Sequence, residues 1–277
     1  MKVACNGKKF TLANLAKRNK ENMQICLIGA GNLAAQLAPA LAAKGHRFLQ
    51  VYSRTESSAA PLACILGCEA VVQPERIRPD ADLYLSALND DDRPQVLAGI
   101  HFGKGLLVHT AGSLPMDVLI EYTSNVGVFY PLQTFSKQRQ VDFSKVPFFI
   151  EATFPESLEI LNTMASSLSN KVVPANSDQR KQMHLAAVFA NNFVNYLYGI
   201  AEDIAHEKGL DFQYLLPLIE ETASKVQTLA PVRAQTGPAV RFDRAVMDKH
   251  LELLQDHPDW LHLYKTLSQG IYERTKK

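Results

Sequence analysis

The sequence predicts an α/β domain built on a mainly parallel, doubly wound sheet, followed by an all-α domain. Short apolar runs of strand length alternate with helical patterns between residues 24 and 174, which is typical of parallel βαβ units. From about Asp178 onward, long helical periodicity replaces the strand signals. A glycine-rich turn separates the first strand from the first helix. We therefore expect a sheet domain over residues 23–176 and a helical domain over residues 177–277.

Each expected element follows from its local pattern and its flanking turn residues. Short apolar runs predict strands at 24–28, 47–52, 70–72, 82–88, 105–109, 126–129, 147–151 and 171–174. Helical periodicity predicts a helix from the glycine turn to Ala43 and further helices near 57–66, 92–99, 115–121 and 155–169. In the helical domain, Gly and Pro punctuation separates helices expected at 178–207, 211–229, 243–255 and 258–274.

Composition excludes several classes of protein. The 47% hydrophobic and 21% charged residues are ordinary globular fractions, and no run of about 18 apolar residues predicts a membrane segment. The net charge of +1 combines a basic segment, residues 1–22, with a remainder at −4, because that segment holds six Lys and Arg against Glu21. The remainder lacks the positive excess that nucleic-acid binding uses, so we expect neither a membrane nor a nucleic-acid partner.

The first residues carry no apolar stretch of signal-peptide length, so we expect a cytoplasmic protein. Two interpretations of residues 1–22 stay open: a flexible, disordered arm, or a segment upstream of a functional start at Met23. Four cysteines occur in the first quarter of the chain: Cys5, Cys26, Cys64 and Cys68. They have no second Cys or His pair at ligand spacing, so we expect buried thiols and no metal site.

The glycine-rich turn predicts a dinucleotide-binding Rossmann domain. The motif Gly29-x-Gly31-x-x-Ala34 follows a strand, opens a helix and precedes a second strand about 20 residues later. The first glycine permits a tight turn, the second lets a pyrophosphate approach the backbone, and the small third residue allows close packing of helix and strand. The phosphates then lie at the helix N-terminus, where backbone N–H groups and the helix dipole favour anions.

The end of the second strand predicts a preference for NADP over NAD. NAD sites place a carboxylate there for the ribose 2′-hydroxyl, but Tyr52-Ser53-Arg54-Thr55 has none before Glu56. Arg54 can pair with a 2′-phosphate, although it could also be a solvated surface arginine. The residues expected to bind the cofactor are Gly29, Ala30, Gly31, Asn32, Leu33, Ser53, Arg54, Thr55, Ser86, Ala87, Asn89 and Thr110.

The carboxyl ends of the later strands are the expected place of the substrate, since ligands of doubly wound sheets lie there. His109 is the best acid/base candidate at this edge, because an unperturbed imidazole titrates at about pH 6.5. The alternative, that His109 only bonds a loop carbonyl, stays open. Gly112, Tyr130 and Gln133 follow the fifth and sixth strands and are expected to contact the substrate.

These motifs, with His109-Thr-Ala-Gly-Ser113, Tyr130-Pro-Leu-Gln-Thr-Phe135 and Thr236-Gly-Pro-Ala-Val-Arg241, resemble a known superfamily. It contains pyrroline-5-carboxylate reductase, ketopantoate reductase and 6-phosphogluconate dehydrogenase. The chain more closely resembles a bacterial family of Rossmann-like proteins with a C-terminal helical domain of unknown function, labelled as NADP oxidoreductases. The resemblance implies a cofactor cleft between the domains and a homodimer formed through the helical domains. That family commonly has histidine where this chain has Tyr130.

Three polar residues of the helical domain complete the expected site. His184, Asn191 and Asn195 share one face of an otherwise apolar helix, which we expect to be buried. Asn191 and Asn195 resemble asparagines of ketopantoate reductase and the hydroxyacid dehydrogenases, but Ala187 stands at the position of their catalytic lysine. His184 could replace that lysine, or the polar stripe could be structural. Arg241 could bind a substrate carboxylate or stabilise the domain contact.

The sequence thus predicts an NADP-dependent oxidoreductase that transfers hydride to or from a small carbonyl or imine. His109 or His184 would handle the proton, and Asn191 would orient the substrate. Two alternatives stay open: a non-catalytic NADP-binding sensor or assembly protein that has lost the lysine, and a reductase that works with a deazaflavin partner.

Overall fold

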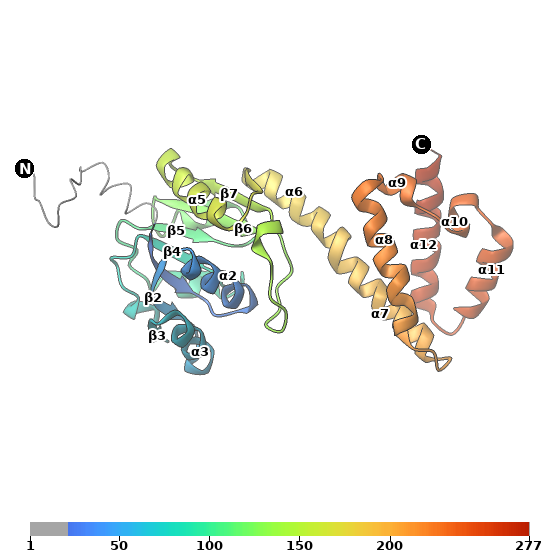
Figure 1. Ribbon diagram of the computed structural model, residues 1–277, viewed down its shortest axis with the longest axis horizontal. Helices are drawn as coiled ribbons and strands as arrows, with labels where there is room; N and C mark the ends of the chain where they lie inside the picture. Colours follow the sequence, from blue (N-terminus) through green and yellow to red (C-terminus); the bar gives the residue numbers. More distant parts are fainter. Residues whose placement is uncertain (1–21, 277) are drawn as a thin grey trace, which may run out of the picture. The chain divides into compact units, whose positions relative to one another are not determined.

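The computed structural model of the chain describes residues 22–276 (Figure 1). The interpretations of the basic N-terminal segment, except at Asn22, therefore lie outside the described residues. Two compact units make up the described chain, the first ending at Val188 and the second beginning at Phe189. No helix among residues 22–276 is both long and apolar enough to cross a membrane.

The first unit is built on one eight-stranded sheet in the order β3-β2-β1-β4-β5-β6-β7-β8. Neighbouring strands are parallel except β6 and β7, which are antiparallel. The strands are β1 (Gln24–Ile28), β2 (Arg47–Tyr52), β3 (Glu69–Val71), β4 (Leu83–Ser86), β5 (Leu106–His109), β6 (Val126–Pro131), β7 (Phe148–Ala152) and β8 (Val172–Pro174). The predicted doubly wound, mainly parallel sheet is thereby confirmed.

Both faces of the sheet are buried, and alternate side chains of each central strand point to opposite faces. In β1, Ile25 and Leu27 join the apolar cluster on one face, whereas Cys26 and Ile28 join the cluster on the other. This explains why the strands read as continuous apolar runs, since a strand that is buried on both sides needs no polar face. Cys64, by contrast, is exposed, so the expected burial of the thiols is wrong there.

Helices cover the two faces unequally (Figure 1). Three longer helices cover one face: α2 (Asn32–Ala43), α3 (Glu56–Leu66) and α5 (Pro155–Leu168). The other face is covered by the short helix α4 (Arg93–Leu97), the turn η2 (Met116–Leu119) and Ile77, which follows the turn η1 (Pro74–Arg76). The turn η3 (Phe143–Lys145) precedes β7, and α6 (Ser177–Ala187) follows β8.

Helix α6 belongs to the first unit, so the compact units divide after Val188 rather than after residue 176. The reason is a buried arginine that the sequence pattern did not single out. Arg180 of α6 is fully buried and bonds the Glu151 carboxylate of β7 and the Leu114 carbonyl. The point in the sequence where strands and helices stop alternating therefore marks the end of the sheet, whereas the first compact unit continues through α6.

The second unit is entirely helical within the described residues. A π-helical turn, η4 (Val188–Asn192), leads from α6 into the unit. Its other elements are α7 (Phe193–His206), η5 (Phe212–Leu215), α8 (Leu216–Thr228), α9 (Pro231–Ala234), α10 (Pro238–Arg241), α11 (Arg244–Leu253) and α12 (Pro258–Thr275). The four long helices predicted from periodicity are present, the first interrupted by the π-helical turn.

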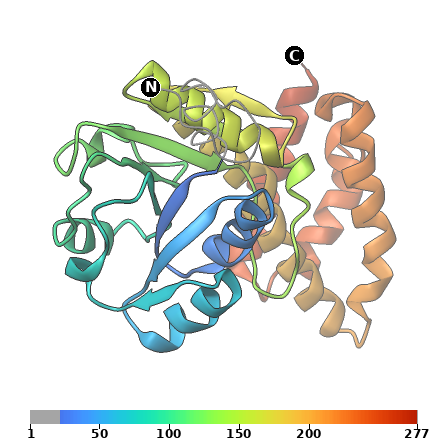
Figure 2. The ribbon, with the colours of Figure 1, turned by 60° about the vertical axis from the view of Figure 1, so that its left-hand side comes forward.

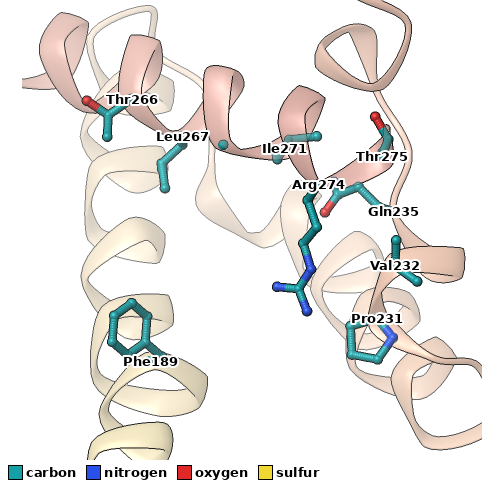
Figure 3. A pocket seen from close by; sticks show the side chains of 10 residues that line it. Phe189, Pro231, Val232, Gln235, Thr266, Leu267, Ile271, Arg274 and Thr275 are labelled. Atoms are coloured by element: carbon teal, nitrogen blue, oxygen red, sulfur yellow. The ribbon is translucent and has the colours of Figure 1, made fainter. Parts of the chain in front are cut away.

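The helical unit buries little of its apolar surface in a single chain. Among its described residues only Ala239 and Ser268 are buried, while Phe189 is 63% exposed and Tyr196 is 60% exposed. The expectation that the face bearing Asn191 is buried is therefore wrong for one chain. The unit also contains an apolar hollow of about 410 Å³, which Phe189, Pro231 and Leu267 line together with the Arg274 side chain (Figure 3).

Candidate cofactor and active site

The glycine turn after β1 has the backbone geometry that its sequence predicts. Gly29 has φ +110°, and a Cβ atom added there would lie 2.7 Å from the Ala87 carbonyl oxygen. The Gly29 N–H donates to the Tyr52 carbonyl at 2.9 Å, so the turn is bound to β2 and pressed against the end of β4. Both the conformation and the close approach therefore require glycine.

The N-terminus of α2 is open to an anion. Gly31 is its N-cap residue and provides no side-chain cap, and no acidic residue lies in the first turn. A Cβ atom added at Gly31 would meet nothing within 4 Å, so space remains beside the backbone. Uncapped N–H groups together with the positive end of the helix dipole favour a phosphate there.

A cavity of about 290 Å³ lies over this turn and gathers most of the predicted cofactor residues. The predicted residues that line it are Gly29, Ala30, Gly31, Asn32, Ser53, Arg54, Ala87 and Asn89. The lining residues that sequence reasoning missed are Ser58, Leu88, Asp92 and Lys137. The carboxyl ends of β1, β2 and β4 thus contribute to one site, as expected for a doubly wound sheet.

Arg54 forms an ion pair in this cavity. Its Nη1 atom lies 2.8 Å from Oδ1 of Asp92, and the two side chains are 68% and 27% exposed. The sequence showed no carboxylate beside Arg54, because Asp92 is 38 residues away in the chain and follows β4 instead of β2. The guanidinium that we expect to bind a 2′-phosphate therefore already has an anionic neighbour.

Four predicted cofactor residues lie outside the lining of the cavity. Leu33 packs against the apolar core, and the Thr55 hydroxyl donates to the Ser58 hydroxyl at 2.9 Å. Thr110 is buried and donates its N–H to the Ser86 carbonyl at 3.2 Å. The Ser86 hydroxyl is fully buried and has no hydrogen-bond partner in the described chain.

His109 holds a loop in this structure, which favours the structural interpretation over a catalytic one. The side chain is fully buried. Its Nδ1 atom accepts the Ala111 N–H at 3.1 Å, and its Nε2 atom lies 3.3 Å from the Pro115 carbonyl oxygen. Burial, together with the charges of Arg93 and Arg180, lowers the pKa of His109 to about 3. Both ring nitrogens thus have partners within the loop, and a catalytic role for His109 stays a prediction.

Tyr130 and His184 instead form a polar pair near the carboxyl end of β6. The Tyr130 hydroxyl lies 3.1 Å from Nδ1 of His184, and the rings meet edge to face. Gly112 makes room for them, since a Cβ atom there would lie 2.6 Å from Cζ of Tyr130 and 2.8 Å from Nδ1 of His184. Three predicted residues from different segments are thus brought together.

A buried ionic cluster fastens α6, and with it His184, to the sheet. Arg180 and Glu151 form an ion pair in which the arginine side chain is fully buried. Ser177 donates its N–H at 3.1 Å and its hydroxyl at 2.9 Å to the Glu151 carboxylate. Because Arg180 precedes His184 by one helical turn, this cluster sets the position of His184. The sequence analysis did not predict this cluster. The position of Arg180, one helical turn before the candidate His184, could have indicated it.

Among the remaining predicted residues of the first unit, Gln133 does not join this pair. Gln133 is exposed and lines a separate hollow of about 410 Å³ with Thr134 and Arg139. Asn191, Asn195 and Arg241 belong to the second unit, where all three are exposed.

The sheet order, the glycine turn and the uncapped α2 N-terminus define a dinucleotide-binding protein of the Rossmann type. Residues 24–111 match the family described as "NADP oxidoreductase coenzyme F420-dependent", and residues 146–271 match a domain of unknown function, DUF2520. No curated protein matches the sequence.

Solved structures extend these matches over most of the chain. A Bacteroides fragilis protein described as "putative NADP oxidoreductase" is 50% identical, with a TM-score of 0.87, over 92% of this chain and 99% of that one. An imine reductase from Myxococcus stipitatus in complex with NADP⁺ is 15% identical, with a TM-score of 0.60, over 91% and 93% of the two chains. A pyrroline-5-carboxylate reductase from Streptococcus pyogenes is 14% identical, with a TM-score of 0.59, over 92% and 99%.

The chain therefore belongs to the family of NADP oxidoreductases in which this domain precedes DUF2520. The expected cofactor, NADP, is the one that the family description names. The residues present fit it: the open side of Gly31 leaves room for a pyrophosphate, and Arg54, which pairs with Asp92, is the cation at the end of β2 that would face a 2′-phosphate.

Proposed function

We propose that the protein is an NADP-dependent oxidoreductase that transfers hydride to or from a small carbonyl or imine substrate, with Tyr130 and His184 as its proton-transfer pair. The observation that carries this proposal is the 3.1 Å contact between the Tyr130 hydroxyl and Nδ1 of His184. A hydroxyl that is hydrogen-bonded to an imidazole is a recurrent arrangement for moving a proton.

The order of the strands supports a site in which Arg54 lies at one end and the Tyr130–His184 pair at the other. Along the sheet the strands run β2, β1, β4, β5 and β6, so Arg54 follows the first of these five strands and Tyr130 lies in the last. Four strand spacings of about 4.8 Å separate β2 from β6, or about 19 Å in total. The glycine turn lies between them, beside β1. A dinucleotide with its 2′-phosphate at Arg54 would therefore extend its other end toward the pair.

The charge of Arg180 favours Tyr130 as a proton donor. Burial raises the pKa of Tyr130 and so makes its hydroxyl a weaker acid, whereas the charge of Arg180 opposes that rise. When bound, the reduced cofactor NADPH would supply a hydride to the substrate carbon and leave as NADP⁺. The Tyr130 O–H would donate its proton to the oxygen or nitrogen of the substrate. His184, which is partly exposed, would return a proton from solvent to the tyrosine oxygen.

The test is Tyr130→Phe, assayed for NADPH oxidation with a panel of cyclic imines and small carbonyl compounds. General acid catalysis contributes about 10² to 10⁴ in rate, so turnover is expected to fall by about a hundredfold or more while NADPH binding stays unchanged. His184→Ala should act in the same direction. Tyr122→Phe is the matched control, because Tyr122 is a partly buried tyrosine that precedes β6 at the opposite end of that strand.

If Tyr130→Phe keeps full turnover, the pair is structural and the proton donor lies elsewhere. If the wild-type protein binds NADPH but reduces no compound of the panel, a non-catalytic NADP-binding role gains support. Ala187, at the position of the superfamily lysine, favours that alternative.

A second candidate function is hydride exchange between NADP and a deazaflavin. The observation that favours it is the family description of residues 24–111, which names coenzyme F420. Reduction of a deazaflavin by NADPH would identify this function, and its absence alongside imine reduction would exclude it.

We also propose that the protein acts as a cytoplasmic homodimer associated through the helical unit. The large apolar side chains that this unit leaves exposed support association with a second copy.

A further inference from the structure

The phosphate end of the cavity needs more positive charge than Arg54 provides. NADP carries a pyrophosphate and a 2′-phosphate, whereas Arg54 already pairs with the Asp92 carboxylate at 2.8 Å. Lys137 lines the same cavity and is exposed. Lys137 forms no ion pair with any residue between 22 and 276. Lys137 is thus the cation of this cavity whose charge is not offset by a neighbouring carboxylate.

Helix α2 holds the segment that carries Lys137. The Gln36 side-chain amide donates to the Ser136 carbonyl at 3.0 Å, and its oxygen accepts the Val141 N–H at 3.4 Å. Gln36 lies about one turn after the glycine turn on α2, so both ends of its amide fasten the segment beside the phosphate-binding end of that helix. Figure 2 shows this segment, which follows β6, running alongside α2.

We propose that Lys137 is a phosphate-binding residue of the NADP site and that Gln36 positions it. This inference rests on the proposed function, because it assumes that the cavity over Gly31 receives the dinucleotide. Lysine provides a compact charge with three donors on a flexible stem, which suits a phosphate that approaches from solvent. The glycine turn would bind the cofactor from the sheet side, and Lys137 would close the opposite side.

The experiment titrates NADPH and NADH separately against the full-length wild-type protein and Lys137→Ala, with cofactor fluorescence as the readout. We expect the variant to bind NADPH about tenfold more weakly, since one charge-assisted hydrogen bond is lost. An equal loss for NADH would show that Lys137 contacts the pyrophosphate, and a loss confined to NADPH would show that it contacts the 2′-phosphate. Either result supports the proposal.

Lys145→Ala is the matched control. Lys145 lies on the same segment and carries the same charge, but it lines the neighbouring hollow with Asp142 instead of the cavity at the glycine turn. Unchanged binding of both cofactors by Lys137→Ala, or an equal loss in Lys145→Ala, would overturn the proposal while the wild-type titration still supports NADP binding. A wild-type protein that binds neither cofactor would overturn the proposed function as well.

The role of Gln36 is tested by a double-mutant cycle. Gln36→Ala should weaken NADPH binding in the wild type and have little further effect in the Lys137→Ala background, because the positioned charge is then already absent. Full additivity of the two losses would show that Gln36 does not act through Lys137.

Discussion

Arg54 and Asp92 form the ion pair on which the expected preference for NADP depends. The arginine is the group at the end of β2 that can recognise a 2′-phosphate, and the aspartate both neighbours it and would repel that phosphate. Because both side chains remain partly exposed, water screens the ion pair, and its contribution to the free energy of unfolding is small. Arg54 is therefore free to exchange its partner when a phosphate arrives.

Opposite effects are expected from removing the two charges. Arg54→Ala should weaken NADPH binding by about tenfold or more and leave NADH nearly unchanged, because a charge-assisted hydrogen bond to the 2′-phosphate is lost. Asp92→Asn should strengthen NADPH binding by about two- to fivefold, since exposed charge pairs contribute about 0.2 to 1 kcal/mol. Fluorescence titrations of both cofactors measure these changes. Weaker NADPH binding by Asp92→Asn would mean that the carboxylate serves to orient Arg54.

Among the elements, β5 and the loop after it depend on His109. The buried imidazole contacts the Ala111 N–H and the Pro115 carbonyl oxygen, so it holds the loop that carries Gly112. In the unfolded chain it takes up a proton as the pH falls through about 6.5, whereas in the folded protein it stays neutral down to about pH 3. The unfolded state thus binds more protons in this window, and stability declines as the pH falls through it.

Between pH 7 and pH 5 this one group should remove about 2 kcal/mol from the free energy of unfolding. His109→Asn should lose that contribution to the pH dependence, because its amide does not titrate but can still accept the Ala111 N–H. Urea unfolding at both pH values provides the measurement, and the exposed His101→Asn serves as the control. An unchanged pH dependence in His109→Asn would contradict the buried neutral state of this histidine.

At the scale of the whole molecule, the helical unit leaves much of its apolar surface uncovered in one chain. Leu253 is 75% exposed and Leu218 is 63% exposed, in addition to Phe189 and Tyr196. Single exposed apolar residues need no explanation, but several on a unit with only two buried described residues form a surface that the proposed association with a second copy would cover. A second copy of the chain provides the same surface and can cover it by two-fold symmetry.

Light scattering at micromolar concentration is therefore expected to give about twice the 30.7 kDa mass of the chain. Dimer formation should also protect the amides of α7 and α8 from hydrogen exchange as the protein concentration rises. A concentration-independent mass of one chain would contradict the homodimer.

The elements of the first unit were predictable because their signals are local. Strands β1 and β2 have the bounds that the sequence predicted, and the glycine turn has the positive φ at Gly29 that the motif implies. The parallel sheet followed from the alternation of strands and helices, since parallel neighbours need crossover helices. Most of the residues predicted from the turn and strand ends also line one cavity.

What the sequence determined by itself was therefore the fold class and the glycine turn with its positive φ at Gly29, because each depends on residues close together in the chain. The tertiary structure alone decided which distant side chains meet. It brought Asp92 to Arg54, Lys137 to the glycine turn, and Tyr130 to His184. It also buried His109, which from the sequence looked like the acid/base residue. Burial and partners depend on packing between segments far apart in the chain, and they decide the charge and reactivity of a side chain.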